Sequence, residues 1–363
     1  MTLAISGTTG ITLAGQFNSA SSMGFKNRII NSAMVIDQRN AGASITTASG
    51  NNYDPDRWLV YDAVGSKMSL QQVTDAPAGF VKSQKITSLA ATTPSSTDYY
   101  FNCQRIEGFN IADFGWGTAS AATVTLSFWV KSSLTGSFSG AFGNASFSRS
   151  YPFSYTISAA NTWEQKTVTV AGDTSGTWAT DNSTGIQVVF DLGSGSSRAG
   201  TANVWSANDY RKVTGSVSVV GTNGATFYVT GVQLEKGSTA TSFDYRPYGT
   251  ELALCQRYFE KSYVSGTVPA TVTEVGVAYT LVGNSAGNPA SNVYFKVSKR
   301  TTPTELSIYS PVTGTIAKVR NSTAGTDENS TAYGTSENGF AALGSTSTSA
   351  TCFRFQWTAG SEL

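Results

Sequence analysis

Hydrophobic and polar residues alternate with a period of two through much of the chain between residues 27 and 247. In the segment 124–130, the residues that share one face of an extended chain are Val124, Leu126, Phe128 and Val130. Comparable runs occupy residues 162–170, 186–193 and 224–235, and clusters of Gly, Ser, Asn and Asp separate them. This pattern predicts strands of an antiparallel β-sandwich.

One strand of this pattern carries a large aromatic residue on each face. Trp129 follows Phe128, so one of the two must point away from the core between the sheets. A ligand-binding surface would explain such a residue. A second buried face beneath a loop would explain it equally.

Two shorter segments flank the sandwich. In residues 1–25, Leu3, Ile5, Ile11 and Leu13 alternate with polar residues between glycines, which indicates a short strand or hairpin, and a disordered tail stays open as the alternative. Residues 250–261 predict the one helix, with Thr250 as its N-cap and Glu251 near the positive end of the helix dipole. Its apolar side consists of Leu252, Cys255, Tyr258 and Phe259. We expect this helix to act as a hinge, or to pack around a symmetry axis in an oligomer.

Beyond the helix, the alternating pattern returns. Strands are predicted at residues 275–283, 291–300, 304–311 and 351–359, and the polar stretch 321–351 is expected to be a surface loop. The predicted fold is therefore all-β: an antiparallel β-sandwich, a short helix and a second, smaller β-sandwich.

Composition narrows the possible functions. The chain has 36 glycines and 12% aromatic residues but only 13% charged residues, which is typical of a β-rich protein. It has no histidine, which excludes a His-based catalytic triad and a His-ligated zinc site. The three cysteines, Cys103, Cys255 and Cys352, are too far apart for a CxxC site and odd in number, so a reducing compartment is expected during folding.

Charge and motifs exclude further classes. The net charge is +1 and the basic residues are scattered singly, so a nucleic-acid partner is not expected. The N-terminal residues lack a charged region and a long apolar run, so neither secretion nor membrane insertion is expected. No phosphate-binding loop or dinucleotide fingerprint occurs in the right context, and we expect no cofactor and no metal.

Without histidine, acid–base catalysis would need a pair of carboxylates. The candidates are Asp54, Asp56, Glu107, Asp173 and Asp181. Asp54 and Asp56 flank Pro55, where a turn-stabilising role is favoured over a catalytic one. We therefore expect no enzymatic activity and no catalytic residue.

Aromatic side chains in loop-like contexts are the stronger functional candidates. They are Trp116, Trp178, Trp205 and Tyr210. Such rings offer flat, rigid surfaces on which weakly charged glycans can stack. Each ring could instead close the end of a sandwich core, so both interpretations stay open.

A series of motifs carries a family resemblance. The segments are residues 27–40, 56–58 (DRW), 76–80 (APAGF), 104–144, 161–178 and 224–262 (ending FDYRPYGTELALCQRYFEKS). Together they resemble the carbohydrate-binding-module-like domain of bacteriophage tail fibres and related virion structural proteins. The resemblance covers about 220 residues.

This resemblance implies a jelly-roll sandwich and a place on the phage particle. The implied organisation is an anchoring segment at residues 1–25, a jelly roll at 26–247, a helical linker at 248–262 and, at 263–363, a distal domain that is a candidate for receptor binding. It further implies a homotrimer assembled in the host cytoplasm, which joins a tail or capsid protein through residues 1–25 and contacts a host surface glycan during adsorption. The chain departs from long fibres in having no heptads and no repeat-built shaft.

Three functional hypotheses follow. The first is a short, non-catalytic tail fibre that contacts host polysaccharide through the loop aromatics and the C-terminal domain. The second is a structural particle component, namely a head fibre, decoration protein or adaptor. The third is a depolymerase, which would need a carboxylate pair and lacks the long repeat-built β-helix of such enzymes.

Overall fold

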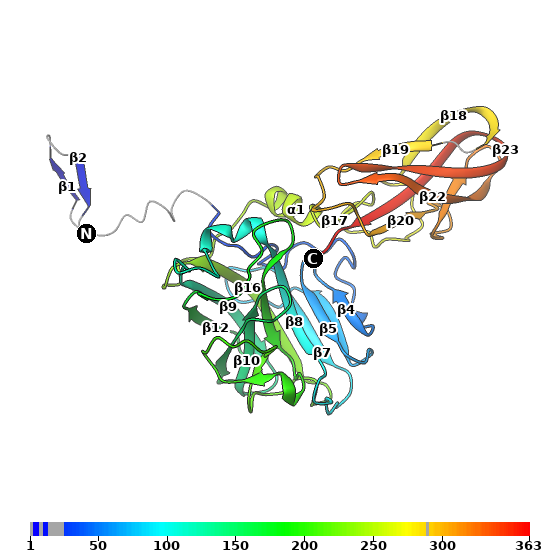
Figure 1. Ribbon diagram of the computed structural model, residues 1–363. Coiled ribbons are helices and arrows are strands. Elements are labelled where there is room, and N and C mark those ends of the chain that lie inside the picture. Colours follow the sequence, from blue (N-terminus) through cyan, green and yellow to red (C-terminus); the bar gives the residue numbers. More distant parts are fainter. Residues whose placement is uncertain (1–2, 7–9, 14–24, 288–289) are drawn as a thin grey trace.

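The computed structural model describes residues 3–6, 10–13, 25–287 and 290–363 (Figure 1). Two six-stranded antiparallel sheets form a sandwich. The first, called here the β8 sheet, contains in spatial order β11 (Ser150–Ile157), β10 (Gly136–Gly143), β13 (Thr184–Asp191), β8 (Tyr100–Glu107), β5 (Leu59–Asp62) and β4 (Gly50–Tyr53). The second, called the β9 sheet, contains β12 (Glu164–Val170), β9 (Val124–Ser132), β16 (Thr226–Lys236), β7 (Ser83–Ser88), β6 (Met68–Val73) and β3 (Ile45–Thr46).

The chain crosses repeatedly between the two sheets, as in a jelly roll. Three short 3₁₀ turns lie in the connections, η1 (Gly108–Asn110), η2 (Ala112–Phe114) and η3 (Ser196–Arg198). A small parallel pair, β14 (Ala199–Gly200) and β15 (Lys212–Val213), lies between β13 and β16 in the chain. The predicted fold class is confirmed.

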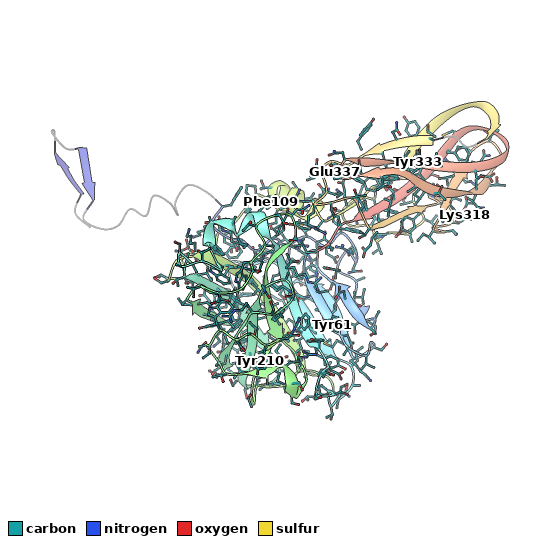
Figure 2. All side chains as sticks on the ribbon, in the orientation of Figure 1. Tyr61, Phe109, Tyr210, Lys318, Tyr333 and Glu337 are labelled. Carbon is teal, nitrogen blue, oxygen red and sulfur yellow. The ribbon has the colours of Figure 1, made fainter. Side chains whose placement is uncertain are left out.

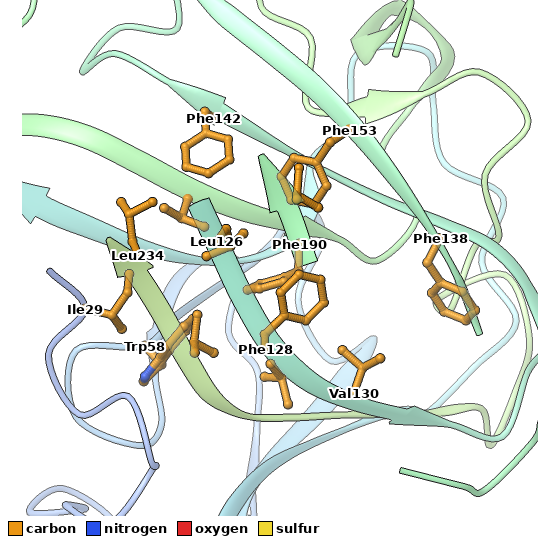
Figure 3. Close-up of a cluster of buried hydrophobic side chains, with 14 of the residues drawn as sticks. Ile29, Trp58, Leu126, Phe128, Val130, Phe138, Phe142, Phe153, Phe190 and Leu234 are labelled. Atoms are coloured by element: carbon orange, nitrogen blue, oxygen red, sulfur yellow. The ribbon is translucent and has the colours of Figure 1, made fainter. Parts of the chain in front are cut away.

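The core between the sheets is rich in aromatic residues (Figure 3). Val124, Leu126, Phe128 and Val130 are all buried in it, as the alternation predicts. The Phe128 ring lies 5.0 Å from the Phe190 ring at 70°, an edge-to-face arrangement that joins β9 to β13 across the sandwich. The largest fully buried side chains are all aromatic, so each of these rings contributes a large buried surface.

The helix α1 (Tyr248–Gln256) is shorter than predicted. Pro247, not Thr250, is the N-cap residue, and its carbonyl accepts from the Glu251 N–H at 3.1 Å. The predicted helical end instead forms β17 (Phe259–Lys261), because β23 offers it a strand to pair with. This long-range pairing outweighs the local helical pattern.

The C-terminal part is a curled antiparallel sheet built on one long strand, β23 (Gly339–Gly360). The other strands are β17, β18 (Ala278–Gly287), β19 (Ala290–Tyr294), β20 (Glu305–Tyr309), β21 (Lys318–Asn321) and β22 (Thr326–Ser336), and β23 pairs with all of them. The inward side chains of β23 include Phe353, Phe355 and Trp357.

The expectation of a surface loop at residues 321–351 is wrong. Most of this segment belongs to β22 and to the first half of β23, which pair from Asn329 opposite Ser345 to Ser336 opposite Gly339. Only one face of this sheet packs on a core, where Phe340 and Ala342 are buried. Ser and Thr can therefore occupy the open face of a regular strand.

The junction between the sandwich and the C-terminal sheet is closely packed. Cys255 and Tyr258 share a buried cluster with Ile30 and Ile36 of the sandwich. The chain end also returns to the sandwich, where the Glu362 carboxylate pairs with Arg57 and lies 3.1 Å from Arg39. The apolar side of α1 is thus covered by this chain itself.

At the N-terminus, the described segments form the predicted hairpin. Strands β1 (Leu3–Ser6) and β2 (Gly10–Leu13) pair antiparallel, with Leu3 opposite Leu13. Within the described ranges, no helix has the length and apolar character needed to cross a membrane.

Candidate functional site

Three of the four predicted aromatic residues come together in one cluster. The Trp116, Trp178 and Trp205 rings, called the tryptophan cluster, lie 4.8 to 5.5 Å apart and close to perpendicular. Each indole N–H donates to a backbone carbonyl at 2.8 to 3.1 Å. The bonds of Trp116 to Ala122 and of Trp178 to Ser175 stay within one loop, whereas the bond of Trp205 to Ala171 joins two loops.

The tryptophan cluster closes the end of the sandwich core. Trp116 and Trp178 are only 5% and 7% exposed, which agrees with the interpretation that these rings close the core. Trp205 is half-buried and packs on Tyr151 at 5.1 Å. The edge-to-face contacts use the ring faces that a sugar would need.

Tyr210 lies apart from the cluster, near the lower end of the sandwich in Figure 2. It is half-buried, and its ring packs so closely over Gly200 that a Cβ there would lie 2.4 Å from the ring. Its backbone N–H donates to the Asn208 carbonyl at 3.0 Å. Glycine at position 200 is therefore required by this ring.

The candidate carboxylates each have a structural partner. Asp54 and Asp56 are buried in the turn between β4 and β5, as the sequence favours. The other three are bonded as follows: Asp173 to Arg149 at 2.6 and 2.8 Å, Glu107 to Arg257 at 2.9 Å and to Tyr258 at 2.7 Å, and Asp181 to the Ser183 N–H at 2.9 Å. These contacts give Asp173, Glu107 and Asp181 structural roles, whereas one buried carboxylate oxygen of Asp54 has no partner among the described residues.

Asp54 makes the folding stability depend on pH. Burial, reinforced by the neighbouring Asp37, raises the pKa of Asp54 to about 8, whereas an unfolded aspartate titrates near pH ~4. The folded state therefore keeps a proton that the unfolded state releases. The stabilisation is complete below about pH 4 and is lost at ~1.4 kcal/mol per pH unit as the pH rises towards 8.

Asp54→Asn is expected to reduce this pH dependence, because the amide imitates the protonated acid. The melting temperature of the variant should fall less between about pH 5 and 8 than that of the wild type. Asp181→Asn, at an exposed position, is the matched control and should keep the wild-type slope. Parallel slopes for Asp54→Asn and the wild type would contradict this assignment.

A different set of aromatic side chains lies on the outer surface of the β9 sheet. Trp129, Trp163 and Tyr228, called the aromatic face, are half-buried, in contrast to Trp116 and Trp178. Phe128 is buried in the core and Trp129 points away from it, as both interpretations of the sequence require. The register places Trp129 between Gln165 of β12 and Thr230 of β16, and no described residue accepts a hydrogen bond from its indole N–H.

One lysine and one carboxylate, Lys131 and Asp75, hold the Trp163 and Tyr228 rings in place. The Lys131 ammonium lies 4.3 Å from the Tyr228 ring centre and 5.2 Å from that of Trp163. Asp75 pairs with Lys131 and accepts the Trp163 indole N–H at 3.1 Å. Partial burial opposes ionisation, but these hydrogen bonds prevail and lower the pKa of Asp75. The rings are thus ordered before any ligand arrives, which reduces the entropy cost of binding.

This arrangement suits the C–H face of a pyranose ring. Aromatic rings on the sheet supply the stacking surface, and the exposed Gln165 amide and the Trp129 N–H can bond hydroxyl groups at its edge. Sequence reasoning did not single out Trp163 or Tyr228. The signal existed for Tyr228, because alternation places it opposite the buried Phe227 and Val229.

Within the described residues, no group of three or more Cys, Asp or Glu side chains is arranged to hold a metal ion. A site of that chemistry is therefore not assigned to this part of the chain.

Comparison with known proteins finds similarity only among solved structures. No family model and no curated protein matches the chain. It is similar to the enzymatically active domain of tailspike protein 4 of bacteriophage CBA120, with 12% identity and a TM-score of 0.30, over 58% of this chain and 22% of that one. It is also similar to a putative sugar-binding protein of Bacteroides thetaiotaomicron, with 13% identity and a TM-score of 0.32, over 58% of this chain and 100% of that one. A structure described as CBM4 matches at 15% identity and a TM-score of 0.29, over 57% and 98% of the two chains.

Proposed function

We propose that this protein is a non-catalytic, carbohydrate-binding structural protein of a phage particle, in the form of a short trimeric tail fibre that contacts host surface polysaccharide. The observation that supports glycan binding is the aromatic face, in which three partly exposed rings lie on one sheet beside the exposed amide of Gln165. The resemblance of the motifs between residues 27 and 262 supports the virion setting. On this proposal the protein assembles in the host cytoplasm and joins a tail or capsid protein through residues 1–25.

Trp129→Ala is expected to weaken glycan binding by about ten-fold or more while leaving the fold intact. Loss of one stacked ring removes roughly 1.5–3 kcal/mol of apolar burial with the ligand. The measurement is binding of the purified protein to an array of bacterial surface polysaccharides, followed by titration of the best ligand. Tyr333→Ala is the matched control, since Tyr333 is 69% exposed on the C-terminal sheet (Figure 2).

Two results would count against this function. Wild-type protein that binds no polysaccharide at high micromolar concentration would argue against host recognition. Release of new reducing ends from a bound polysaccharide would make the protein a depolymerase instead.

A purely structural role, as a head fibre, decoration protein or adaptor, is the second candidate. Tyr294 and Tyr333 are 78% and 69% exposed, and the register places them on one face of the sheet, opposite Gly339 and Ala341 of β23. Exposed rings beside such small residues suit a flat protein contact. Imaging of the virion with labelled protein separates tail from capsid and counts the copies at each position.

A further inference from the structure

Two adjoining hollows lie along helix α1, where the sandwich meets the C-terminal sheet. One has a volume of about 310 Å³ and a mostly polar lining, and the other has a volume of about 220 Å³ and a mostly apolar lining. Val35 and Tyr248 belong to the walls of both. We call the pair the junction groove. It is formed by residues other than those of the aromatic face.

The smaller hollow has an ordered aromatic wall. Phe243 lies 4.9 Å from Phe80 and 4.7 Å from Tyr245 between ring centres. The Tyr245 hydroxyl donates to the Gly79 carbonyl, and the Phe80 ring packs over Gly231. Tyr245 and Tyr248 are nevertheless 58% and 54% exposed, so ring surface remains free for a ligand. Rings fixed in this way can stack on a sugar at low entropy cost.

Gln256 contributes a side-chain amide to the wall of the larger hollow. Gln256 lines this hollow and is only 7% exposed, yet no described residue exchanges a hydrogen bond with its side-chain amide. The amide donor and acceptor therefore stay open to the hollow and can bond a ligand there. The hydroxyl groups of a sugar supply both.

The charges that line this hollow favour an anion. Asp37 is its acidic residue, and its two carboxylate oxygens accept the Asn40 and Gly42 backbone N–H groups at 2.8 and 2.6 Å. The Lys261 ammonium is occupied by three backbone carbonyls at 2.6 to 3.1 Å. The ammonium of Lys296, in contrast, pairs with no described carboxylate. It is the cation that remains free to meet a ligand carboxylate.

We propose that the junction groove binds an oligosaccharide that contains a uronic acid, with one ring against the aromatic wall at Tyr248 and the carboxylate of the next ring at Lys296. Gln256 bonds hydroxyl groups of the acidic residue. This inference does not rest on glycan binding by the aromatic face, and each site can be tested without the other.

The test is titration calorimetry of the full chain with two matched probes, β-1,4-linked tetramannuronate and the neutral β-1,4-mannotetraose. Wild-type protein should bind the acidic probe about ten-fold more tightly or better, and added salt should reduce that preference. Lys296→Ala should remove the preference, and Tyr248→Ala should weaken binding of both probes. Both side chains are exposed, so neither variant is expected to disturb folding.

Lys318→Ala is the charge-matched control, because Lys318 lies at the opposite end of the C-terminal sheet from α1 (Figure 2). Equal affinity of wild type and Lys296→Ala for tetramannuronate would overturn the proposal, as would no binding by wild type at millimolar probe. Loss of binding in Trp129→Ala but not in Tyr248→Ala would assign these sugars to the aromatic face and remove them from the groove.

Discussion

Lys299→Met is expected to lower the free energy of unfolding by about 3–5 kcal/mol. Lys299 and Glu260 form an ion pair at 2.5 Å whose two side chains are 0% exposed. The same ammonium donates to the Gln256 carbonyl at 2.7 Å and to the Val297 carbonyl at 3.0 Å. Methionine fills a similar volume but leaves the carboxylate charged and buried without its partner. Urea denaturation followed by circular dichroism measures the change.

Two variants identify the cause of this loss. Lys299→Met combined with Glu260→Gln removes both charges and should recover a large part of the stability. Arg354→Ala breaks an exposed pair with Glu274, whose side chains are 33% and 46% exposed, and should cost less than about 1 kcal/mol. A loss in Lys299→Met no larger than that in Arg354→Ala would show that the buried pair does not hold the junction.

Trp116→Ala is expected to destabilise the sandwich by about 3–5 kcal/mol. The Trp116 ring contacts Trp178, Trp205 and Phe142, and its indole N–H is bonded to the Ala122 carbonyl. Truncation leaves a cavity among rings that are held by several loops. Urea denaturation followed by tryptophan fluorescence gives the free energy of unfolding. The near-ultraviolet circular dichroism signal of the neighbouring indole rings should decrease, because their electronic transitions no longer interact.

Trp129→Ala is the matched control for this prediction, since it removes the same side chain from an outward position. Its stability should change by less than about 1 kcal/mol. Similar losses for the two variants would mean that the tryptophan cluster contributes no more to the core than an outward residue does.

The alternation of apolar and polar residues predicted the sandwich, because every second residue of a strand lies on the same face of its sheet. Val124, Leu126, Phe128 and Val130 follow the period of two and are all buried. The same rule left Trp129 on the outside. Its neighbours on the sheet are Gln165 and Thr230, which lie 36 and 101 residues further along the chain. Local periodicity does not specify which strands pair, so these neighbours could not be predicted.

The tryptophan cluster shows the limit of local reasoning. Trp116 lies between two glycines, a context typical of exposed turns. Its burial depends on Trp178 and Trp205, which come from distant loops. The junction groove could not be predicted for the same reason, because Phe80, Tyr248 and Lys296 are brought together only by the complete fold.

In two places, pairing with β23 prevailed over the local pattern. Residues 259–261 continue the apolar spacing of α1, yet they pair with residues 358–360. The polar segment 326–336 has little apolar periodicity, yet it forms β22 beside residues 339–345. Strand formation here depends on the partner as much as on the segment itself.

The length and position of β23 also determine when the two parts of the protein can fold during synthesis. The sandwich has all its strands once β16 has left the ribosome, whereas every other strand of the C-terminal sheet pairs with residues 339–360. Strands β18, β19 and β20 must therefore wait without a partner strand until β23 is translated, whereas β21 and β22 can pair with each other earlier. We infer that ribosomes stalled before residue 339 carry a folded sandwich followed by a tail open to proteases and chaperones.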